Sequence, residues 1–181
     1  MTREDHAAVF LDRDGTLIRA AVIEGRPGSI RDEEELELEP GASDACDALE
    51  AAGFPLIVVT NQPEIARGSN SRTAVERIHV RLLELLPLDE IVVCPHDDED
   101  DCPCRKPKPG MLIDAAERHG LDLLTSYMVG DRWRDVEAGQ RAGCTSVFLN
   151  REYSETVPER PDVTVRTIGE AATWILAREG R

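Results

Sequence analysis

The chain has 181 residues, of which 41% are hydrophobic and 31% charged, and its formal net charge is −15. This length fits one domain with a core that needs no disulfides, and no apolar stretch approaches the roughly 20 residues that span a membrane. A nucleic-acid partner is disfavoured, because binding a polyanion depends on Lys and Arg displacing its counterions. The polar start of the chain, residues 1–6, lacks the apolar core of a signal peptide, so we expect a cytoplasmic protein.

Predicted strands and helices alternate along the chain. Apolar, β-branched runs predict buried strands, whereas apolar residues three and four positions apart predict helices. The Gly/Pro-containing and then acidic stretch 19–39 predicts a flap or loop. In chain order we predict strand 8–11, helix 42–52, strand 55–60, helix 71–86, strand 88–94, helix 111–119, strand 126–131, helix 136–142, strand 145–149, strand 163–165 and helix 171–178. This alternation indicates a single α/β domain, 1–181, with a doubly wound, mainly parallel sheet.

Four polar clusters each follow an apolar strand. The first contains Asp12 and Asp14, and two carboxylates so close together are stable only if one is protonated or a cation neutralises them. Because open α/β sheets bind ligands at the carboxyl ends of their strands, we expect the four clusters to converge there. The other three contain Thr60 and Asn61, Arg105 and Lys106, and Asp131 and Asp135.

The first cluster, Asp12-Arg13-Asp14-Gly15-Thr16, resembles the DxDGT motif of the haloacid dehalogenase (HAD) superfamily. The resemblance implies that Asp12 is a nucleophile that forms an aspartyl-phosphate and that Asp14 is the general acid and base. Thr60 and Asn61 resemble the second motif of the superfamily, in which a hydroxyl and the next backbone amide hold phosphoryl oxygens. An ordinary turn is the other interpretation of this pair.

The third cluster begins the segment Arg105-Lys106-Pro107-Lys108-Pro109-Gly110-Met111, which resembles the third motif. The resemblance selects Lys106 as the cation that offsets the negative charge of the nucleophile and the phosphate. Lys108 is the alternative candidate for this role. Arg105 is expected to be a second contact to the substrate phosphate, since guanidinium groups bind such groups bidentately.

The fourth cluster, from Gly130 to Asp135, resembles the GDxxxD form of the last motif. The resemblance implies a catalytic Mg²⁺ held by Asp131, a carboxylate oxygen of Asp12 and the backbone carbonyl of Asp14. Asp135 is expected either to orient the metal site or Lys106, or to cap the following helix. Arg132 is a further candidate contact to the substrate.

Four soft metal ligands lie close together in the loop 94–104. Thiolates and an imidazole suit tetrahedral zinc, and a closed set of four leaves no position for water, so the predicted zinc site is structural. A disulfide is the alternative, and the expected cytoplasmic location disfavours it. The predicted ligands are Cys94, His96, Cys102 and Cys104.

The predicted zinc ligands are followed directly by Arg105 and Lys106. This arrangement resembles the sequence of one branch of the superfamily, the small capless phosphatases of subfamily IIIA. Members of this branch act on heptose bisphosphate or histidinol phosphate, so the resemblance implies a small phosphorylated metabolite as substrate. Heptose 1,7-bisphosphate is the preferred candidate, and histidinol phosphate or another sugar phosphate is the alternative. A polynucleotide 3′-phosphatase and a non-catalytic zinc-stabilised binding module are the less favoured alternatives. We expect a monomer or weak dimer with no membrane partner.

Overall fold

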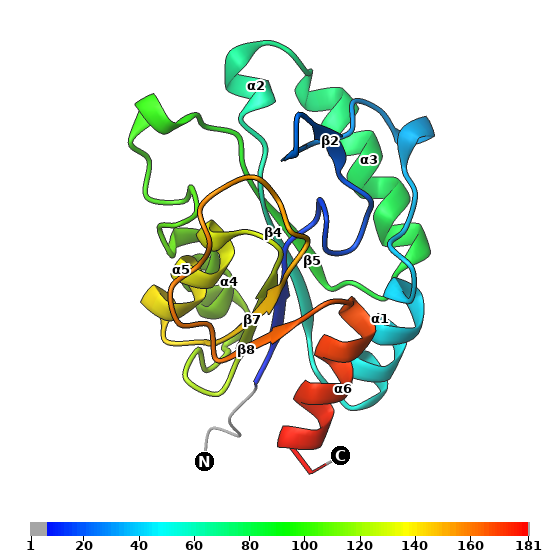
Figure 1. Cartoon of the computed structure of the whole chain (residues 1–181), viewed down its shortest axis with the longest axis vertical. Coiled ribbons are helices and arrows are strands. Elements are labelled where there is room, and N and C mark those ends of the chain that lie inside the picture. The colour runs from blue at the N-terminus through cyan, green and yellow to red at the C-terminus, as the bar shows by residue number, and fades with distance from the viewer. Residues whose placement is uncertain (1–6, 181) are drawn as a thin grey trace.

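The computed structural model describes residues 7–180, so the polar segment 1–6 lies outside the described residues. A six-stranded sheet with strand order β5-β4-β1-β6-β7-β8 runs through the molecule, and every neighbouring pair is parallel (Figure 1). This architecture confirms the predicted doubly wound α/β fold. The strands are β1 (Val9–Leu11), β4 (Leu56–Asn61), β5 (Glu90–Cys94), β6 (Tyr127–Gly130), β7 (Thr145–Leu149) and β8 (Val163–Val165).

Helices cover both faces of the sheet. Because side chains alternate along a strand, Val9 and Leu11 of β1 belong to one hydrophobic core and Phe10 to the other. The first core is closed by α1 (Ala42–Ala51), α3 (Arg72–Leu85) and α6 (Ile168–Arg178), and the second by α4 (Gly110–His119) and α5 (Trp133–Ala142). Burial on both faces explains why these strands are continuously apolar in the sequence.

Several boundaries differ from those predicted. Helix α5 begins at Trp133, three residues before the apolar periodicity does, because its first turn carries Asp135 and is stabilised by this side chain accepting a hydrogen bond from the Arg132 backbone. The stretch predicted as a flap or loop, 19–39, contains a hairpin of β2 (Ala21–Ile23) and β3 (Arg26–Gly28).

Three short helical segments were not predicted, because each is too short to show a periodic pattern. They are the single turns η1 (Glu33–Glu35), α2 (Glu64–Arg67) and η2 (Asp98–Asp100).

Strands β4 and β6 flank β1 on either side, and their registers bring the ends of all three strands to the same edge of the sheet. Leu11 pairs with Val58 of β4 and Val129 of β6. The polar residues that follow these strands therefore meet at that edge, as expected for a parallel sheet. Within residues 7–180, no helix has the length and apolar character needed to cross a membrane.

Candidate active site

Lys106 and Asp12 form a buried ion pair at the carboxyl end of β1. Lys106 Nζ lies 2.6 Å from Asp12 Oδ1 and also donates to the carbonyl oxygen of Val59, at 2.7 Å. Burial raises the pKa of the Asp12 carboxyl to about 6, although the ammonium of Lys106 acts in the opposite direction. Burial alone would lower the pKa of Lys106, but Asp12 and Asp135 outweigh it and the pKa is raised. Lys106 is therefore a fixed positive charge next to the predicted nucleophile.

Asp131 follows β6 and is 1% exposed. Neither of its carboxylate oxygens makes a hydrogen bond of standard geometry within the described residues. Burial, with Asp12 next in effect, raises the pKa of Asp131 well above its usual range. Oxygens of Asp12, Asp131 and Asp135 lie within 4.8 Å of one another. A buried carboxylate without a partner among other carboxylates is the arrangement that a divalent cation satisfies.

Gly15 makes the close approach of Asp131 possible. Its φ is +82°, a left-handed conformation that favours glycine, and a Cβ at this position would lie 1.9 Å from Asp131 Oδ2. The glycine of the first motif therefore has a steric role at the site as well as a conformational one.

Asp14 is held by several donors. Arg13 Nε and Nη2 donate to its two carboxylate oxygens, both at 3.1 Å, and Gln62 Nε2 donates to Oδ2 at 2.9 Å. Arg13 is fully buried and also contacts His79 of α3, with 2.8 Å between Arg13 Nη1 and His79 Nε2. Burial, followed by the charge of Arg13, lowers the pKa of His79 to about 4, so the imidazole is neutral at pH 7 and accepts from the guanidinium.

Thr60 and Asn61 end β4 and have different contacts. The Thr60 hydroxyl accepts from Gln62 Nε2 at 2.9 Å and is buried beside Asp14. Asn61 pairs with the backbone of Lys106 in both directions, since Asn61 Nδ2 donates to the carbonyl at 3.0 Å and the amide of Lys106 donates to Asn61 Oδ1 at 3.1 Å. The Asn61 side chain thus fixes the backbone of the residue whose ammonium contacts Asp12.

Asp135 makes both of the contacts expected for it. Its Oδ1 lies 2.6 Å from Lys106 Nζ, and its Oδ2 accepts from the backbone amide of Arg132 at 3.0 Å. One carboxylate therefore holds the ammonium of Lys106 and stabilises the first turn of α5.

The two predicted substrate-binding arginines have acidic partners. Arg105 Nε donates to Asp98 Oδ1 at 2.8 Å and its Nη1 to the carbonyl of His96 at 3.2 Å, so the zinc-ligand loop holds it. Arg132 forms a bidentate pair with Glu155, in which Nη2 lies 2.6 Å from Oε2. Lys108, the competitor of Lys106, pairs with Asp101 and does not line the cavity.

A cavity of about 390 Å³ opens over these residues. Both acids of the first motif reach it, Asp12 and Asp14, and Thr60 and Asn61 line it as predicted. Despite the net charge of −15, six cationic side chains line this cavity: Arg26, Arg67, Arg105, Lys106, Arg132 and Arg134. Five acidic side chains line it as well, so the cavity lining is close to neutral in a strongly acidic protein, and its arginines and lysine can contact a phosphorylated ligand.

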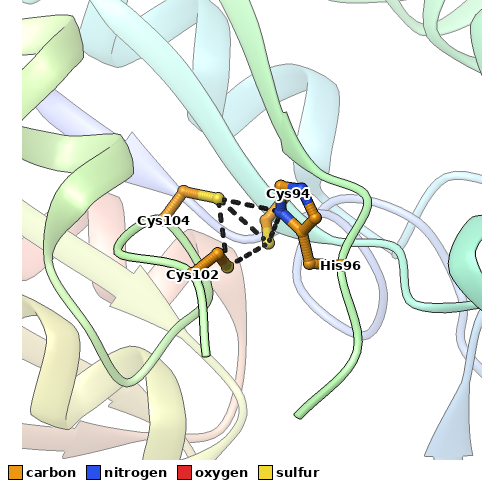
Figure 2. Close-up of side chains that lie close together, drawn as sticks. All are labelled: Cys94, His96, Cys102 and Cys104. Atoms are coloured by element: carbon orange, nitrogen blue, oxygen red, sulfur yellow. Dashed lines mark hydrogen bonds between the residues drawn. The ribbon is translucent and has the colours of Figure 1, made fainter. Parts of the chain in front are cut away.

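The four predicted zinc ligands come together beside the cavity. Figure 2 shows Cys94, the last residue of β5, and His96, two residues later, turned toward Cys102 and Cys104. Their sulfur atoms lie 3.3–3.6 Å apart, and His96 Nδ1 lies 3.4 Å from Cys104 Sγ. Zn–S bonds of about 2.3 Å in a tetrahedron would separate sulfurs by about 3.8 Å, so the cluster fits zinc to within a few tenths of an ångström. The five cysteines, all within residues 7–180, form no disulfide.

The fold and the site define a HAD-type hydrolase, and the chain belongs to that family. Residues 19–143 match the family described as haloacid dehalogenase-like hydrolase. Among curated proteins, the chain is similar to D-glycero-beta-D-manno-heptose-1,7-bisphosphate 7-phosphatase of Escherichia coli K12, at 35% identity over 93% of this chain and 87% of that protein. The enzyme of the same name from Mesorhizobium japonicum is 39% identical over 78% of this chain and 68% of its own length.

Solved structures of HAD phosphatases share the fold of this chain. The D,D-heptose 1,7-bisphosphate phosphatase from B. bronchiseptica, complexed with magnesium and phosphate, has a TM-score of 0.82 and 28% identity, covering 95% of this chain and 99% of that one. A putative HAD-like phosphatase from Mesorhizobium loti has a TM-score of 0.78 and 32% identity, covering 96% of this chain and 87% of that one. These comparisons confirm the predicted family and the predicted class of enzyme, a phosphatase.

Several residues that shape the site were not assigned a role from the sequence. Arg13 and Gln62 lie within the motifs and contact Asp14, whereas His79, Tyr153 and Glu155 come from distant segments. A charged residue directly after an apolar strand is a signal for Arg13. The distant residues have no local pattern, because their contacts form only through the tertiary fold.

Proposed function

We propose that the chain is a Mg²⁺-dependent phosphomonoester hydrolase that removes the 7-phosphate of D-glycero-D-manno-heptose 1,7-bisphosphate through an aspartyl-phosphate on Asp12. One observation carries this proposal: Lys106 Nζ lies 2.6 Å from Asp12 Oδ1, next to the buried carboxylate of Asp131. The relatives named as 7-phosphatases of this sugar, similar over most of their length, support the substrate.

In the first step, an oxygen of Asp12 attacks the phosphorus in line with the ester oxygen, so that a bond from Asp12 to phosphorus forms and the ester bond breaks. Asp14, protonated, donates its proton to the leaving oxygen of the sugar. In the second step, Asp14 takes a proton from water, whose oxygen attacks the phosphorus and releases Asp12. Lys106 stays protonated throughout and offsets the negative charge of the transition state.

Residues around Asp12 and Asp14 hold this geometry. Asn61 fixes the backbone of Lys106, and Thr60 lies at the cavity where its hydroxyl can contact a phosphoryl oxygen. Arg105 and Arg132 line the same cavity and can contact phosphate or sugar oxygens, with Asp98 and Glu155 as their partners in the free protein.

The carboxylates of Asp12 and Asp131, with the backbone carbonyl of Asp14, form a set of hard oxygen donors that fits Mg²⁺. The buried carboxylate of Asp131, which forms no ion pair among residues 7–180, supports a cation there rather than an empty cluster of acids. When bound, Mg²⁺ neutralises the phosphate and Asp12, which lets one anion attack another. The structure from B. bronchiseptica, complexed with magnesium and phosphate, supports this assignment.

We infer a structural Zn²⁺ at Cys94, His96, Cys102 and Cys104, which together leave no coordination position free. This ion orders a loop that is otherwise acidic and proline-containing. Because the loop holds Arg105 through Asp98 and the carbonyl of His96, zinc fixes the position of a cavity arginine. Reduced thiolates of this kind suit the cytoplasm, which we propose as the compartment. We also propose a monomer or weak dimer, which sedimentation analysis can measure.

A second candidate substrate is histidinol phosphate or another sugar phosphate, because the cavity wall departs from the pattern of the heptose enzymes that this chain resembles. Pro63 and Glu64 stand where the heptose enzymes of this branch usually have Ser and Gly, and both line the cavity. Arg26 of the β2–β3 hairpin lines it as well. These side chains contact the part of a substrate beyond the transferred phosphate.

The test is phosphate release with Mg²⁺ from both anomers of the heptose bisphosphate, from histidinol phosphate and from a panel of sugar phosphates. We expect a heptose bisphosphate to exceed the other substrates about a hundredfold in kcat/KM, which corresponds to about 2.7 kcal/mol of transition-state discrimination. A comparable preference for histidinol phosphate would replace the heptose assignment, while activity that persists after removal of Mg²⁺ would contradict the metal-dependent reaction.

A further inference from the structure

The segment after β7 crosses the carboxyl end of the sheet and contacts the site with alternate side chains. It is the loop between β7 and β8, drawn in yellow to orange in Figure 1. Arg151, Tyr153 and Glu155 are partly buried, whereas Glu152 and Ser154 between them are exposed. We call residues 151–155 the covering segment.

Both ends of the covering segment are anchored to motif residues. Arg151 Nε donates to the carbonyl of Gly15 at 2.9 Å, and its Nη2 lies 3.1 Å from Glu39 Oε2. Glu155 accepts three hydrogen bonds from Arg132, the residue directly after Asp131. The segment is therefore fixed on either side of the Asp131 carboxylate, with Tyr153 between its two anchors.

Tyr153 brings a hydroxyl to Asp131. A Cβ placed on Gly15 would meet Asp131 Oδ2 at 1.9 Å and the Tyr153 hydroxyl oxygen at 2.6 Å, so both oxygens adjoin the same small space above this glycine. A phenol can donate one hydrogen bond to a carboxylate. Asp131 and Tyr153, together with other residues of the 148–157 segment, also line a separate cavity of about 50 Å³, apart from the main cavity that holds Asp12.

Asp131 differs from the two neighbouring carboxylates in its partners. Asp12 and Asp135 both contact the ammonium of Lys106, and Asp135 also accepts from a backbone amide. Among residues 7–180, Asp131 alone of these three carboxylates forms no ion pair, and the nearby side-chain donor is the hydroxyl of Tyr153. A metal-binding carboxylate is normally oriented by a donor on its other side, and loss of such a donor costs about 10- to 100-fold in metal affinity.

We propose that Tyr153 is a positioning residue that orients Asp131 for its divalent cation. This inference rests on the proposed function, in which Asp131 holds Mg²⁺. The hydroxyl donates to Oδ2 and leaves the other oxygen of Asp131 for the ion, while the anchors at Arg151 and Glu155 keep the phenol in place. Tyr153 contacts neither substrate nor reacting atoms, so its removal changes the affinity for the cation more than the rate at saturation.

The test is calorimetric titration of Mg²⁺ into the substrate-free protein, with wild type, Tyr153→Phe, Tyr127→Phe and Asp131→Asn compared. Tyr153→Phe keeps the ring and removes only the hydroxyl. The matched control is the other tyrosine of the chain, Tyr127, whose hydroxyl donates to Glu179 at 2.5 Å at the opposite end of β6. A parallel assay of phosphate release against Mg²⁺ concentration separates cation affinity from kcat.

We expect Tyr153→Phe to raise the dissociation constant of Mg²⁺ about tenfold, with kcat at saturating Mg²⁺ within about twofold of wild type, and Tyr127→Phe to leave the affinity unchanged. Unchanged affinity in Tyr153→Phe, while Asp131→Asn binds weakly, would overturn the role of Tyr153 and leave the metal site standing. Unchanged affinity in Asp131→Asn would overturn the metal site itself, and the proposal for Tyr153 with it.

Discussion

Lys106 contacts Asp12 and Asp135 with the same ammonium group, at 2.6 Å from each carboxylate. These three residues come from the segment before α4, the end of β1 and the first turn of α5, and all are at least nine-tenths buried. Two buried carboxylates share one cation, which leaves a net negative charge before Asp131 is counted. Burial and these neighbouring acids raise the pKa of Asp131, and the Mg²⁺ proposed above would offset their negative charge.

Replacement of the nucleophile tests the role of Asp12. We expect Asp12→Asn to lower kcat at least about 10⁴-fold, because an amide oxygen cannot form the phosphorylated intermediate. The fold should persist, since Lys106 keeps its contact with Asp135. Phosphate release measures the first effect and circular dichroism the second. Turnover near the wild-type rate in a folded variant would remove Asp12 as nucleophile.

The two contacts of Asp135 can be separated with two variants. Asp135→Asn keeps an acceptor for the Arg132 amide but loses the charge that faces Lys106, whereas Asp135→Ala loses both. We expect both variants to lower kcat about 10- to 100-fold, since Lys106 is less well positioned. Asp135→Ala should be less stable than Asp135→Asn by about 1 kcal/mol, the usual value of a helix cap. Urea unfolding measures this difference, and equal stabilities would argue against the capping role.

Loss of a zinc ligand should act on both stability and substrate binding. We expect Cys102→Ser to lower bound zinc from about one ion per chain to a small fraction and to reduce the melting temperature. KM should rise, because the same loop holds Arg105. The control is Cys144→Ala, which alters a buried cysteine outside the cluster. Elemental analysis measures the zinc content of each variant, and wild-type zinc content in Cys102→Ser would refute the zinc assignment.

His79 gives a prediction about pH. Its pKa is lowered from 6.5 to about 4 by burial and by Arg13, so the unfolded chain binds a proton more readily than the native protein between these values. Stability is therefore fully present above pH 6.5 and is lost as pH falls toward 4, by as much as about 3 kcal/mol. Unfolding of wild type and His79→Gln in urea across this range isolates the effect. We expect a flatter profile for the variant, and parallel profiles would contradict it.

The candidate site residues could be located in the sequence because each of them follows a strand or precedes a helix. Buried parallel strands are continuously apolar, so the polar residues Asp12, Thr60 and Asp131 are visible where these runs end. Parallel topology then brings those ends to one edge. The proposed zinc ligands could be located for a different reason, since three cysteines and a histidine at short spacing in one loop are typical of a zinc site.

The supporting residues could not be predicted in the same way. His79 reaches Arg13 across 66 positions and Glu155 reaches Arg132 across 23, and neither pair has a local pattern. The first turn of α5 was missed because Trp133 to Asp135 do not fit the apolar periodicity that begins at Val136. The hairpin of β2 and β3 was missed because its strands are three residues long and half-exposed.

Trapping of the intermediate tests the central claim most directly. During turnover of a heptose bisphosphate with Mg²⁺, an acid quench followed by borohydride reduction converts an aspartyl-phosphate into homoserine, which peptide mass spectrometry locates. We predict homoserine at position 12, and none when Mg²⁺ is removed. Reduction at another carboxylate, or no reduction at position 12 in protein quenched during active turnover, would contradict the account.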